Sequence, residues 1–188
     1  MTHPPNSIKA EATSSEELLA RARNGDATAL TELYYTHAGA LFTLAYRLTK
    51  SREEAEDIVH DLFVGLPEAL RKYEERGSAG AWLKRIAARL ALTRLRTLKR
   101  FPEIDVQQLT DTFTTSSEQI SIEGIGLAQA IDSLPEPLRR VFLLKEVEGF
   151  SHAEIAGLLG ISVSASQVRF HRAVRALRRA LTPTPERR

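Results

Sequence analysis

Residues 134–181 read LPEPLRRVFLLKEVEGFSHAEIAGLLGISVSASQVRFHRAVRALRRAL. Within them Pro135-Glu136-Pro137 favours the start of a helix, and Gly149 favours its end. Ser151 and Glu154 have the spacing of a capping box, in which each side chain accepts a hydrogen bond from the other residue's backbone amide. They predict a second, shorter helix, and the apolar segment over residues 127–134 predicts another helix before the first.

Gly160-Ile161-Ser162 predicts a tight turn into a last helix over residues 163–181. A helix, a short turn and a second helix form the arrangement that places the second helix in the major groove of DNA. At 100° per residue, one face of the last helix collects Val163, Phe170, Val174, Leu177 and Leu181, and the other collects Ser164, Ala165, Val168, Arg172, Arg175 and Arg179. We expect the first face to pack inward and the second to face DNA, where Gln167 could pair with adenine and Arg172 with guanine or phosphate. The alternative is a basic helix whose charge only complements its own dipole.

Four more helices are predicted upstream, over residues 14–24, 27–49, 52–73 and 81–99. Ser14 with Glu17 and Ser51 with Glu54 repeat the capping-box spacing. The second helix carries an apolar stripe that we expect to face inward, made of Leu30, Leu33, Tyr34, Leu41, Leu44, Ala45 and Leu48. The third is apolar on more than one side, which suggests a partner, and Pro67 predicts a kink or break in it because proline removes a backbone donor.

A loop and a basic stripe lie at the fourth of these helices. Residues 74–80, EERGSAG, predict a short flexible loop. Arg85, Arg89, Arg96 and Arg100 follow on the helix, all within about 60° of one another. Such a stripe can hold a phosphate backbone while the loop approaches bases, although a solvated outer face would show the same pattern.

Charge is distributed in blocks, although the net charge is only +2. Residues 1–70 carry −5, residues 71–100 carry +8, residues 101–125 carry −5 and residues 126–188 carry +4. Clustered lysines and arginines release counterions from phosphates, so the two basic blocks suggest two contacts with a polyanion. The acidic block between them has weak periodicity and predicts a linker.

Together these patterns predict an all-α fold of two small helical domains joined by a flexible linker. The expected segments are a disordered N-terminal tail (1–13), a first helical domain (14–100), an acidic flexible linker (101–126), a second helical domain with the helix-turn-helix (127–182) and a C-terminal tail (183–188).

Composition argues against several classes of protein. No apolar run approaches the roughly 20 residues that span a bilayer, and no secretory signal is visible, so we expect a cytoplasmic protein without membrane insertion. Without cysteine there is no disulfide or thiolate metal site, and the five histidines form no zinc-binding pair. No phosphate-binding loop, dinucleotide motif or serine-nucleophile motif is present. We therefore expect no enzymatic activity, no cofactor and no metal.

Three stretches in this order resemble the extracytoplasmic-function (ECF) group of bacterial RNA polymerase sigma factors. They are ALTELYYTHAGALFTLAYRLTKSREEAEDIVHDLF at 29–63, WLKRIAARLALTRLR at 82–96 and the stretch at 134–181. The resemblance extends over about residues 16–182. It implies a region 2-like helical bundle, a region 4-like helix-turn-helix and a role in transcription initiation. The implied partners are promoter DNA, core RNA polymerase through the clamp coiled coil of its largest subunit and its flap, and, for some members, an anti-sigma factor.

The resemblance also implies roles for individual residues. The polymerase-binding residues would be Asp57, Ile58, His60, Asp61 and Phe63. Contacts with the −10 promoter element, including capture of an unstacked base by the loop, would come from Arg76, Gly77, Ser78, Trp82, Lys84, Arg85, Arg89, Arg94 and Arg96. Contacts with the −35 element would come from Ser164, Gln167, Val168, Arg169, His171, Arg172 and Arg175. Trp82 could equally be an anchor in the core. The acidic linker would pass through the polymerase cleft and the RNA exit path.

Several residues depart from the family pattern. His60-Asp61 replaces an acidic pair, Pro67 stands where tryptophan is common, and Arg89 and Thr93 replace asparagine and aspartate. In the last helix Ser164-Ala165-Ser166-Gln167-Val168 replaces the common Gly-Thr-Val-Lys-Ser. We expect looser packing at Ser166 and an unusual promoter preference.

Two other classes of protein remain open. A stand-alone two-domain helix-turn-helix regulator would bind its DNA without polymerase, whereas a sigma factor depends on polymerase for promoter melting. A pure interaction module, such as an antagonist of a sigma factor, would not need the arginines after Trp82.

Overall fold

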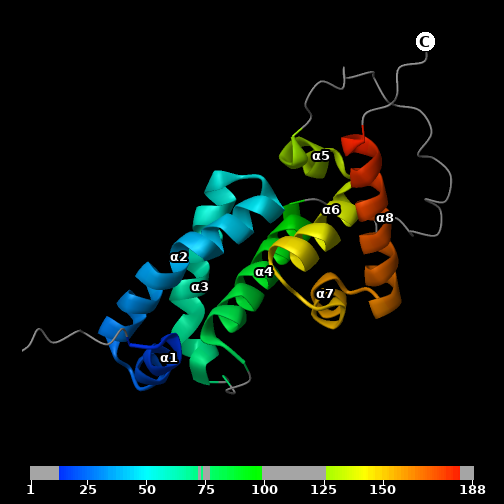
Figure 1. Cartoon of the computed structure of the whole chain (residues 1–188). Coiled ribbons are helices and arrows are strands. Elements are labelled where there is room, and N and C mark those ends of the chain that lie inside the picture. Colours follow the sequence, from blue (N-terminus) through cyan, green and yellow to red (C-terminus); the bar gives the residue numbers. More distant parts are fainter. Residues whose placement is uncertain (1–12, 72, 74–76, 99–125, 183–188) are drawn as a thin grey trace, which may run out of the picture. The chain divides into compact units, whose positions relative to one another are not determined.

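The computed structural model describes residues 13–71, 73, 77–98 and 126–182, and the regular elements of these residues are all helices (Figure 1). The predicted all-α fold is confirmed. Several predictions concern residues outside the described ones. These are the two tails up to residue 12 and from residue 183, loop residues 74–76 with Arg76, and the linker from 99 to 125 with Arg100.

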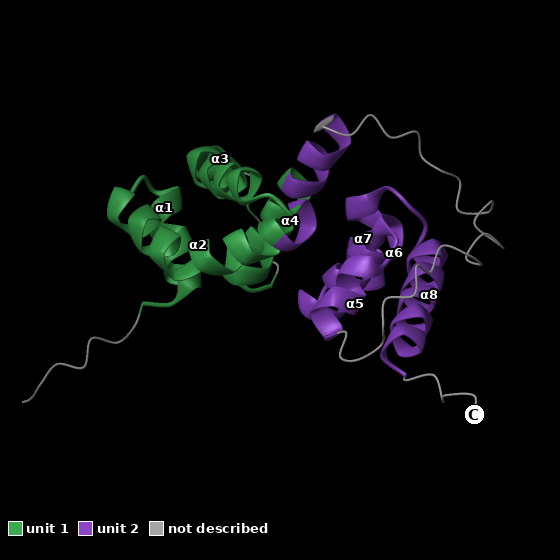
Figure 2. Ribbon diagram, turned by 90° about the horizontal axis from the view of Figure 1, so that it is seen from above, with its two compact units in different colours: residues 1–46, 50–90 green, residues 47–49, 91–188 purple. Residues whose placement is uncertain are grey.

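The chain divides into two compact units (Figure 2). One comprises residues 1–46 and 50–90, and the other comprises residues 47–49 and 91–188. Helices α2 (Ala27–Thr49) and α4 (Ala79–Leu98) therefore contribute residues to both units.

The first helices begin where the capping residues predict. Ser14 and Glu17 form the complete capping box of α1 (Ser15–Arg23). Asp26 caps α2, since its carboxylate accepts hydrogen bonds from the amides of Thr28 and Ala29 at 2.9 and 3.2 Å. Before α3 (Arg52–Arg71), the amide of Glu54 donates to Oγ of Ser51 at 3.2 Å. Short polar side chains thus fix the start of each of these three helices.

Leucines from all four helices form the buried interior of the first unit, and α1 packs against α3. The larger buried side chains include Leu18, Leu19, Leu33, Leu41, Leu44, Ile58, Leu62, Leu66, Leu70 and Leu83. Each leucine or isoleucine removed from water contributes about 1.5–3 kcal/mol, so burial of this set is the main stabilising term of the unit.

Helix α3 continues through Pro67, and the predicted break there is wrong. Leu66 and Leu70 are fully buried on either side of the proline in sequence, while Pro67 itself is exposed. Packing of these two leucines holds the turn helical and offsets the lost backbone hydrogen bond. The helix ends at Arg71, two residues earlier than predicted.

The second unit contains α5 (Leu127–Ser133), α6 (Glu136–Phe142), α7 (His152–Leu159) and α8 (Val163–Leu181). The helix predicted up to Gly149 changes after Phe142 into the π-helical segment η2 (Leu143–Val147). Here the amide of Glu148 reaches back five residues to the carbonyl of Leu143 at 3.0 Å. Its apolar residues also suit an ordinary helix, so the sequence pattern did not predict the wider turn.

Residues of α5, α6 and α8 enclose the core of the second unit. It contains Ala130, Leu134, Leu138, Ala173 and Leu177, with Ile131, Phe142, Ala176 and Ala180 packed around it. The predicted inward face of α8 is partly wrong, because Val163 is 45% exposed and Leu181 is 43% exposed. The buried side is centred on Ser166, Ala173 and Leu177 instead.

Candidate nucleic-acid and polymerase interfaces

Helices α7 and α8 and the turn between them have the predicted helix-turn-helix form. Ser151 and Glu154 make a complete capping box at the start of α7. Gly160 ends α7 with φ of +70°, a backbone conformation that favours glycine. Ser162 then starts α8, since its Oγ accepts a hydrogen bond from the amide of Ala165 at 3.0 Å. Three residues therefore suffice to reverse the chain between the two helices.

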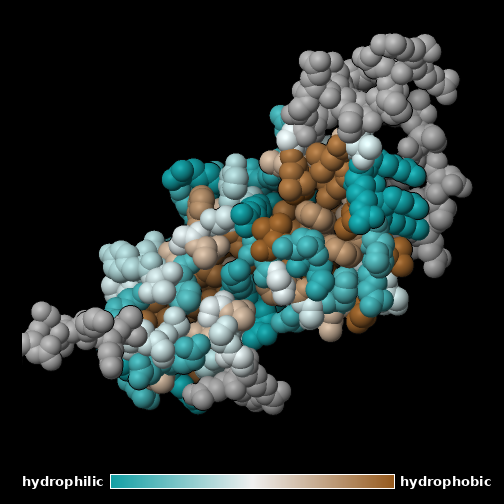
Figure 3. Space-filling model, viewed as in Figure 1, coloured by the Kyte–Doolittle hydropathy of each residue, from teal (hydrophilic) through white to brown (hydrophobic). Residues whose placement is uncertain are grey.

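The outer side of α8 carries most of the predicted −35 residues. Five of them are exposed and fall within about 100° of arc on the helix: Ser164, Gln167, Val168, His171 and Arg175. Arg172 is half-buried beside this arc, and Arg169 is half-buried and turned further toward the core side. Hydrophilic residues gather along the C-terminal part of the helix in Figure 3, where Arg178 and Arg179 are exposed. Polar and basic groups thus share one accessible face.

The predicted −10 residues lie at the start of α4 and along it. Gly77 has φ of +93° and is exposed, as is Ser78, whose Oγ accepts a hydrogen bond from the amide of Ala81 at 3.3 Å. Trp82 is half-buried, and its ring lies 4.5 Å from that of Tyr73. The indole therefore has both an accessible part and a packing role.

The predicted cations of α4 do not all share one face. Arg85, Arg89 and Arg96 fall within about 40° of arc, whereas Arg94 lies about 180° from Arg85. Arg89 and Arg96 are exposed, and Lys84, Arg85 and Arg94 are half-buried. The stripe available to a polyanion is therefore narrower than the set predicted from the resemblance.

Helix α3 presents a continuous outer face. Asp57, His60 and Asp61 are exposed and lie within about 100° of arc. Val64 extends this face at 67% exposure. Ile58 is fully buried in the core, so its side chain cannot reach a partner, and its prediction as a contact residue is wrong. Phe63 is half-buried and contacts Tyr34 edge-on, with ring centroids 5.0 Å apart.

Two family profiles match separate parts of the chain. The profile of Sigma-70 region 2 matches residues 33–101, and that of Sigma-70 region 4 matches residues 126–177. The chain belongs to the ECF group of sigma-70 factors. The predicted family is therefore confirmed.

Similar proteins of known type support this assignment. The sigma factor is 32% identical over 156 residues to the ECF RNA polymerase sigma factor SigE of Mycolicibacterium smegmatis, an alignment that spans 78% of this chain and 59% of that protein. It is 27% identical to the ECF RNA polymerase sigma factor SigW of Bacillus subtilis, over 85% of this chain and 92% of that protein.

Solved structures agree with the fold of the sigma factor. CnrH, solved in complex with the cytosolic domain of CnrY, aligns with a TM-score of 0.57 and 28% identity over 90% of this chain and 97% of that one. The sigma factor RpoE of Bartonella quintana, solved with the anti-sigma factor NepR, aligns with a TM-score of 0.55 over 80% of this chain and 95% of that one. At 22% identity the second likeness concerns the fold alone.

A partly buried polar pair joins the two helices of the helix-turn-helix in this sigma factor. Nδ1 of His152 lies 2.9 Å from Oγ of Ser166, which is 0% exposed. The His152 ring also packs edge-on against Phe170, with centroids 5.7 Å apart. Burial lowers the pKa of His152, and the charges of Lys145 and His171 lower it further. The looser packing expected at Ser166 is therefore wrong, because the hydroxyl finds a partner in a histidine that the sequence analysis did not single out.

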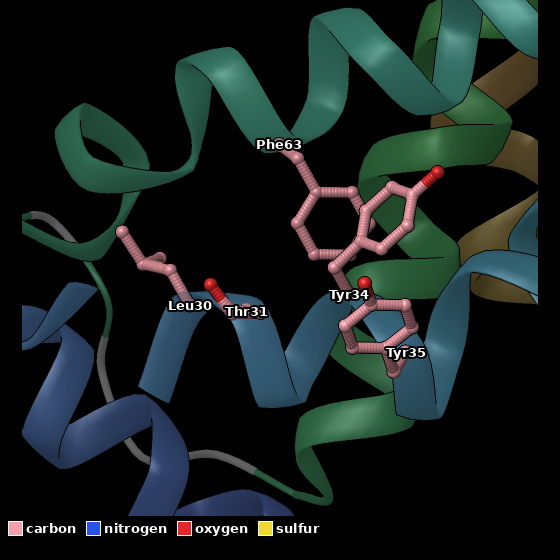
Figure 4. Close-up of a pocket in the computed structure, with 5 residues that line it drawn as sticks. All are labelled: Leu30, Thr31, Tyr34, Tyr35 and Phe63. Carbon is pink, nitrogen blue, oxygen red and sulfur yellow. The ribbon is translucent and has the colours of Figure 1, made fainter. Parts of the chain in front are cut away.

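A pocket of about 250 Å³ opens between α2 and α3 (Figure 4). It is lined by Leu30, Thr31, Tyr34, Tyr35 and Phe63. Tyr34 was expected to face inward but is half exposed, and Tyr35 is 80% exposed. The sequence signal that could have indicated this site is the pair of adjacent tyrosines, because two neighbouring residues on a helix cannot both face the core.

Among the described residues, no group of three histidine or acidic side chains is placed to hold a metal ion. No helix in the described part of the sigma factor is long and apolar enough to cross a bilayer.

Proposed function

We propose that this sigma factor directs core RNA polymerase to promoters through three separate surfaces. The exposed face of α8 reads the −35 element, the start of α4 with its basic stripe holds the −10 element, and the outer face of α3 docks on the largest polymerase subunit. The observation that carries this proposal is the polar, accessible face of α8 on a helix-turn-helix that matches sigma region 4.

Base readout is assigned to the first two turns of α8. Small Ser164 allows the helix to approach the groove closely, and exposed Gln167 can pair bidentately with adenine. Arg175, further along the same face, is suited to a phosphate contact that fixes the register of the helix. Gln167 is therefore the residue expected to determine sequence preference.

At the −10 element, Gly77, Ser78 and Trp82 border the space where an unstacked base would be held. Extruding a base costs a few kcal/mol, which contacts with the protein must offset. We assign two interactions to offset this cost. The base would stack on the accessible part of Trp82, and Arg85 and Arg89 would contact the phosphates.

Docking on polymerase is assigned to Asp57, His60, Asp61 and Val64. Two carboxylates around an apolar side chain suit a partner surface that combines arginine or lysine with apolar groups. By analogy with other ECF sigma factors, the proposal includes three further points. The second unit contacts the polymerase flap, an anti-sigma factor restrains the protein, and the protein acts in the cytoplasm.

Run-off transcription on a fragmented genomic library tests this function. Core polymerase with the sigma factor should produce new starts, each preceded by shared −35 and −10 sequences, that core polymerase alone does not produce. Gln167→Ala should relax the preference at one −35 position by a factor equivalent to about 1–3 kcal/mol. The matched control is Gln129→Ala, which removes the same exposed amide from α5 in the same unit.

The main alternative is a stand-alone helix-turn-helix regulator. It predicts tight, specific DNA binding by the free protein and no polymerase-dependent starts. If the protein bound specific DNA alone and failed to bind core polymerase, the sigma function would be refuted.

A further inference from the structure

The first turns of α1 and α4 meet within the first unit, although their sequences are far apart (Figure 1). The backbone amide of Ala79 donates a hydrogen bond to Oε1 of Glu16 at 3.0 Å. Ala79 is fully buried, and the first amides of a helix have no acceptor within the helix. Glu16 therefore supplies from α1 the acceptor that the first residue of α4 requires.

The charge of Glu16 suits this place. The hydrogen bond from Ala79 lowers the pKa of Glu16 below its usual range, and its own backbone amide and His37 add smaller effects in the same direction against desolvation. The carboxylate is therefore ionised at neutral pH. A negative charge at the positive end of a helix dipole is favourable, so the contact is electrostatic as well as a hydrogen bond.

Helix α2 reinforces the same contact. Nε2 of His37 lies 2.9 Å from Oγ of Ser15, the neighbour of Glu16. The His37 ring also lies against the second residue of α4, because a Cβ on Gly80 would come within 3.4 Å of Cε1 of His37. Two helices therefore hold the first two residues of α4.

The groups assigned to −10 recognition adjoin this contact directly. Ser78 immediately precedes Ala79, and Trp82 follows it by three residues, within the first turn of α4. Tyr73, which precedes α4 in the sequence, contacts the ring of Trp82 and so also helps to hold this turn. A shift of Ala79 would therefore move Ser78 and Trp82 together relative to a captured base.

We propose that Glu16 is a positioning residue for −10 recognition, which sets the place of Ser78 and Trp82 by capping α4 from α1. This inference rests on the proposed function of the start of α4. Glu16 itself makes no contact with DNA in this assignment. Its effect is to reduce the movement of the residues that do.

The test compares two promoters that differ by one base in the −10 element. With wild-type holoenzyme, the ratio of open-complex formation on the two promoters measures −10 discrimination. Glu16→Ala should reduce this ratio by about fivefold, within the range expected for the loss of one hydrogen bond made by an exposed side chain. Glu16→Gln keeps an oxygen acceptor and should restore most of the ratio. Binding to core polymerase should stay within about twofold of wild type, since Glu16 lies on α1 and is not one of the α3 residues assigned to docking.

Glu17→Ala is the matched control. It removes a carboxylate from the same turn of α1 and the reciprocal half of the capping box, but leaves the bond to Ala79 in place. A general loss of folded protein lowers activity on both promoters equally and leaves the ratio unchanged. An unchanged ratio in Glu16→Ala, with discrimination intact in wild type, would overturn this inference. Absence of discrimination in wild type would instead refute the proposed −10 function.

Discussion

Helices α4 and α8, the two assigned to DNA, begin in the same way and are held in different ways. Each follows a serine whose Oγ accepts a hydrogen bond from the amide three residues later, Ser78 from Ala81 and Ser162 from Ala165. Beyond these caps, α8 is fixed by His152, which lies 14 residues before its partner Ser166. The start of α4 is fixed by Glu16, 63 residues before Ala79.

The helix-turn-helix is therefore held by a contact within its own segment, whereas the start of α4 depends on a contact with a helix from a distant part of the sequence. The helix-turn-helix carries its caps, its turn and its polar pair within one short segment, and the inner side of α8 packs on α5 and α6 of the same unit. The start of α4 takes its place from α1 and α2, and changes in those helices should reach the −10 contacts without touching DNA. Substitutions at Leu177 and His152 alter the support of α8 and should leave the start of α4 intact.

The largest expected effect comes from the core that supports α8. Leu177→Ala removes a buried side chain between α5, α6 and α8 and should lower the free energy of unfolding of the second unit by about 2–5 kcal/mol. Chemical denaturation followed by circular dichroism measures this loss. Binding of a single-stranded −10 oligonucleotide by the holoenzyme should change little, whereas −35-dependent binding should fall.

Leu181→Ala provides the control for this substitution. It removes the same atoms from the same helix at a side chain that is 43% exposed, and should cost much less. Equal losses for Leu177→Ala and Leu181→Ala would contradict the assignment of the buried face of α8.

The polar pair within the helix-turn-helix gives the next effect. His152→Ala leaves the fully buried hydroxyl of Ser166 without its partner and should destabilise the protein by about 1–3 kcal/mol. Affinity for the −35 element should fall as well, because α8 loses one of its contacts with α7. Thermal unfolding and fluorescence anisotropy of −35 binding by holoenzyme measure the two effects.

A double-mutant cycle sharpens this prediction. His152→Phe with Ser166→Val replaces the polar pair by apolar groups, and this double variant should be less destabilised than the sum of the two single changes. Additive effects would show that the two side chains do not interact in solution. Phenylalanine at position 152 keeps the ring contact with Phe170.

Sequence reasoning predicted local features well because their causes lie within a few residues. The two complete capping boxes and the start of α8 follow from serine side chains that accept hydrogen bonds from amides three residues away, and the turn at Gly160 follows from the left-handed conformation that glycine favours. Helical periodicity predicted the exposure of Ser164, Val168 and Arg175, whereas Gln167 was singled out for its ability to pair with adenine and His171 only by the resemblance to the family. Tertiary packing accounts for the errors: buried Leu66 and Leu70 hold α3 through Pro67, and Ile58 packs into the core instead of facing a partner.

The positioning contacts could not be predicted for a related reason. Nothing in the sequence near Glu16 distinguishes it from an ordinary acidic residue in a first helical turn, because its partner is a backbone amide 63 residues away. The role of His152 could not be predicted either, because it depends on its contact with Ser166. Ser166 departs from the family pattern, and helical periodicity does not indicate which side chain it contacts. The pocket at Tyr34 and Tyr35 could have been inferred from two adjacent aromatic residues.

The smallest expected effects concern pH, and both units should show them. Burial lowers the pKa of His37 and of His152 below the ordinary value of about 6.5. The unfolded chain therefore binds protons at a higher pH than the folded chain does. The stability contributed by the two neutral imidazoles is complete above about pH 6.5, and is lost as the pH falls through the lowered pKa values. Urea unfolding between pH 8 and 5 should show this decline.

Glu16 connects this titration with the difference between α4 and α8. Its carboxylate raises the pKa of His37 against the larger effect of burial, whereas Lys145 and His171 lower that of His152. Glu16→Gln should therefore lower the pKa of His37 further and leave that of His152 unchanged, as measured by NMR titration of the two imidazoles in the full chain. Glu17→Gln, the matched change one residue away, should move His37 less. A His37 pKa that rises or stays constant in Glu16→Gln would show that the carboxylate does not act on His37, and would contradict this electrostatic contact between α1 and α2 beside the start of α4.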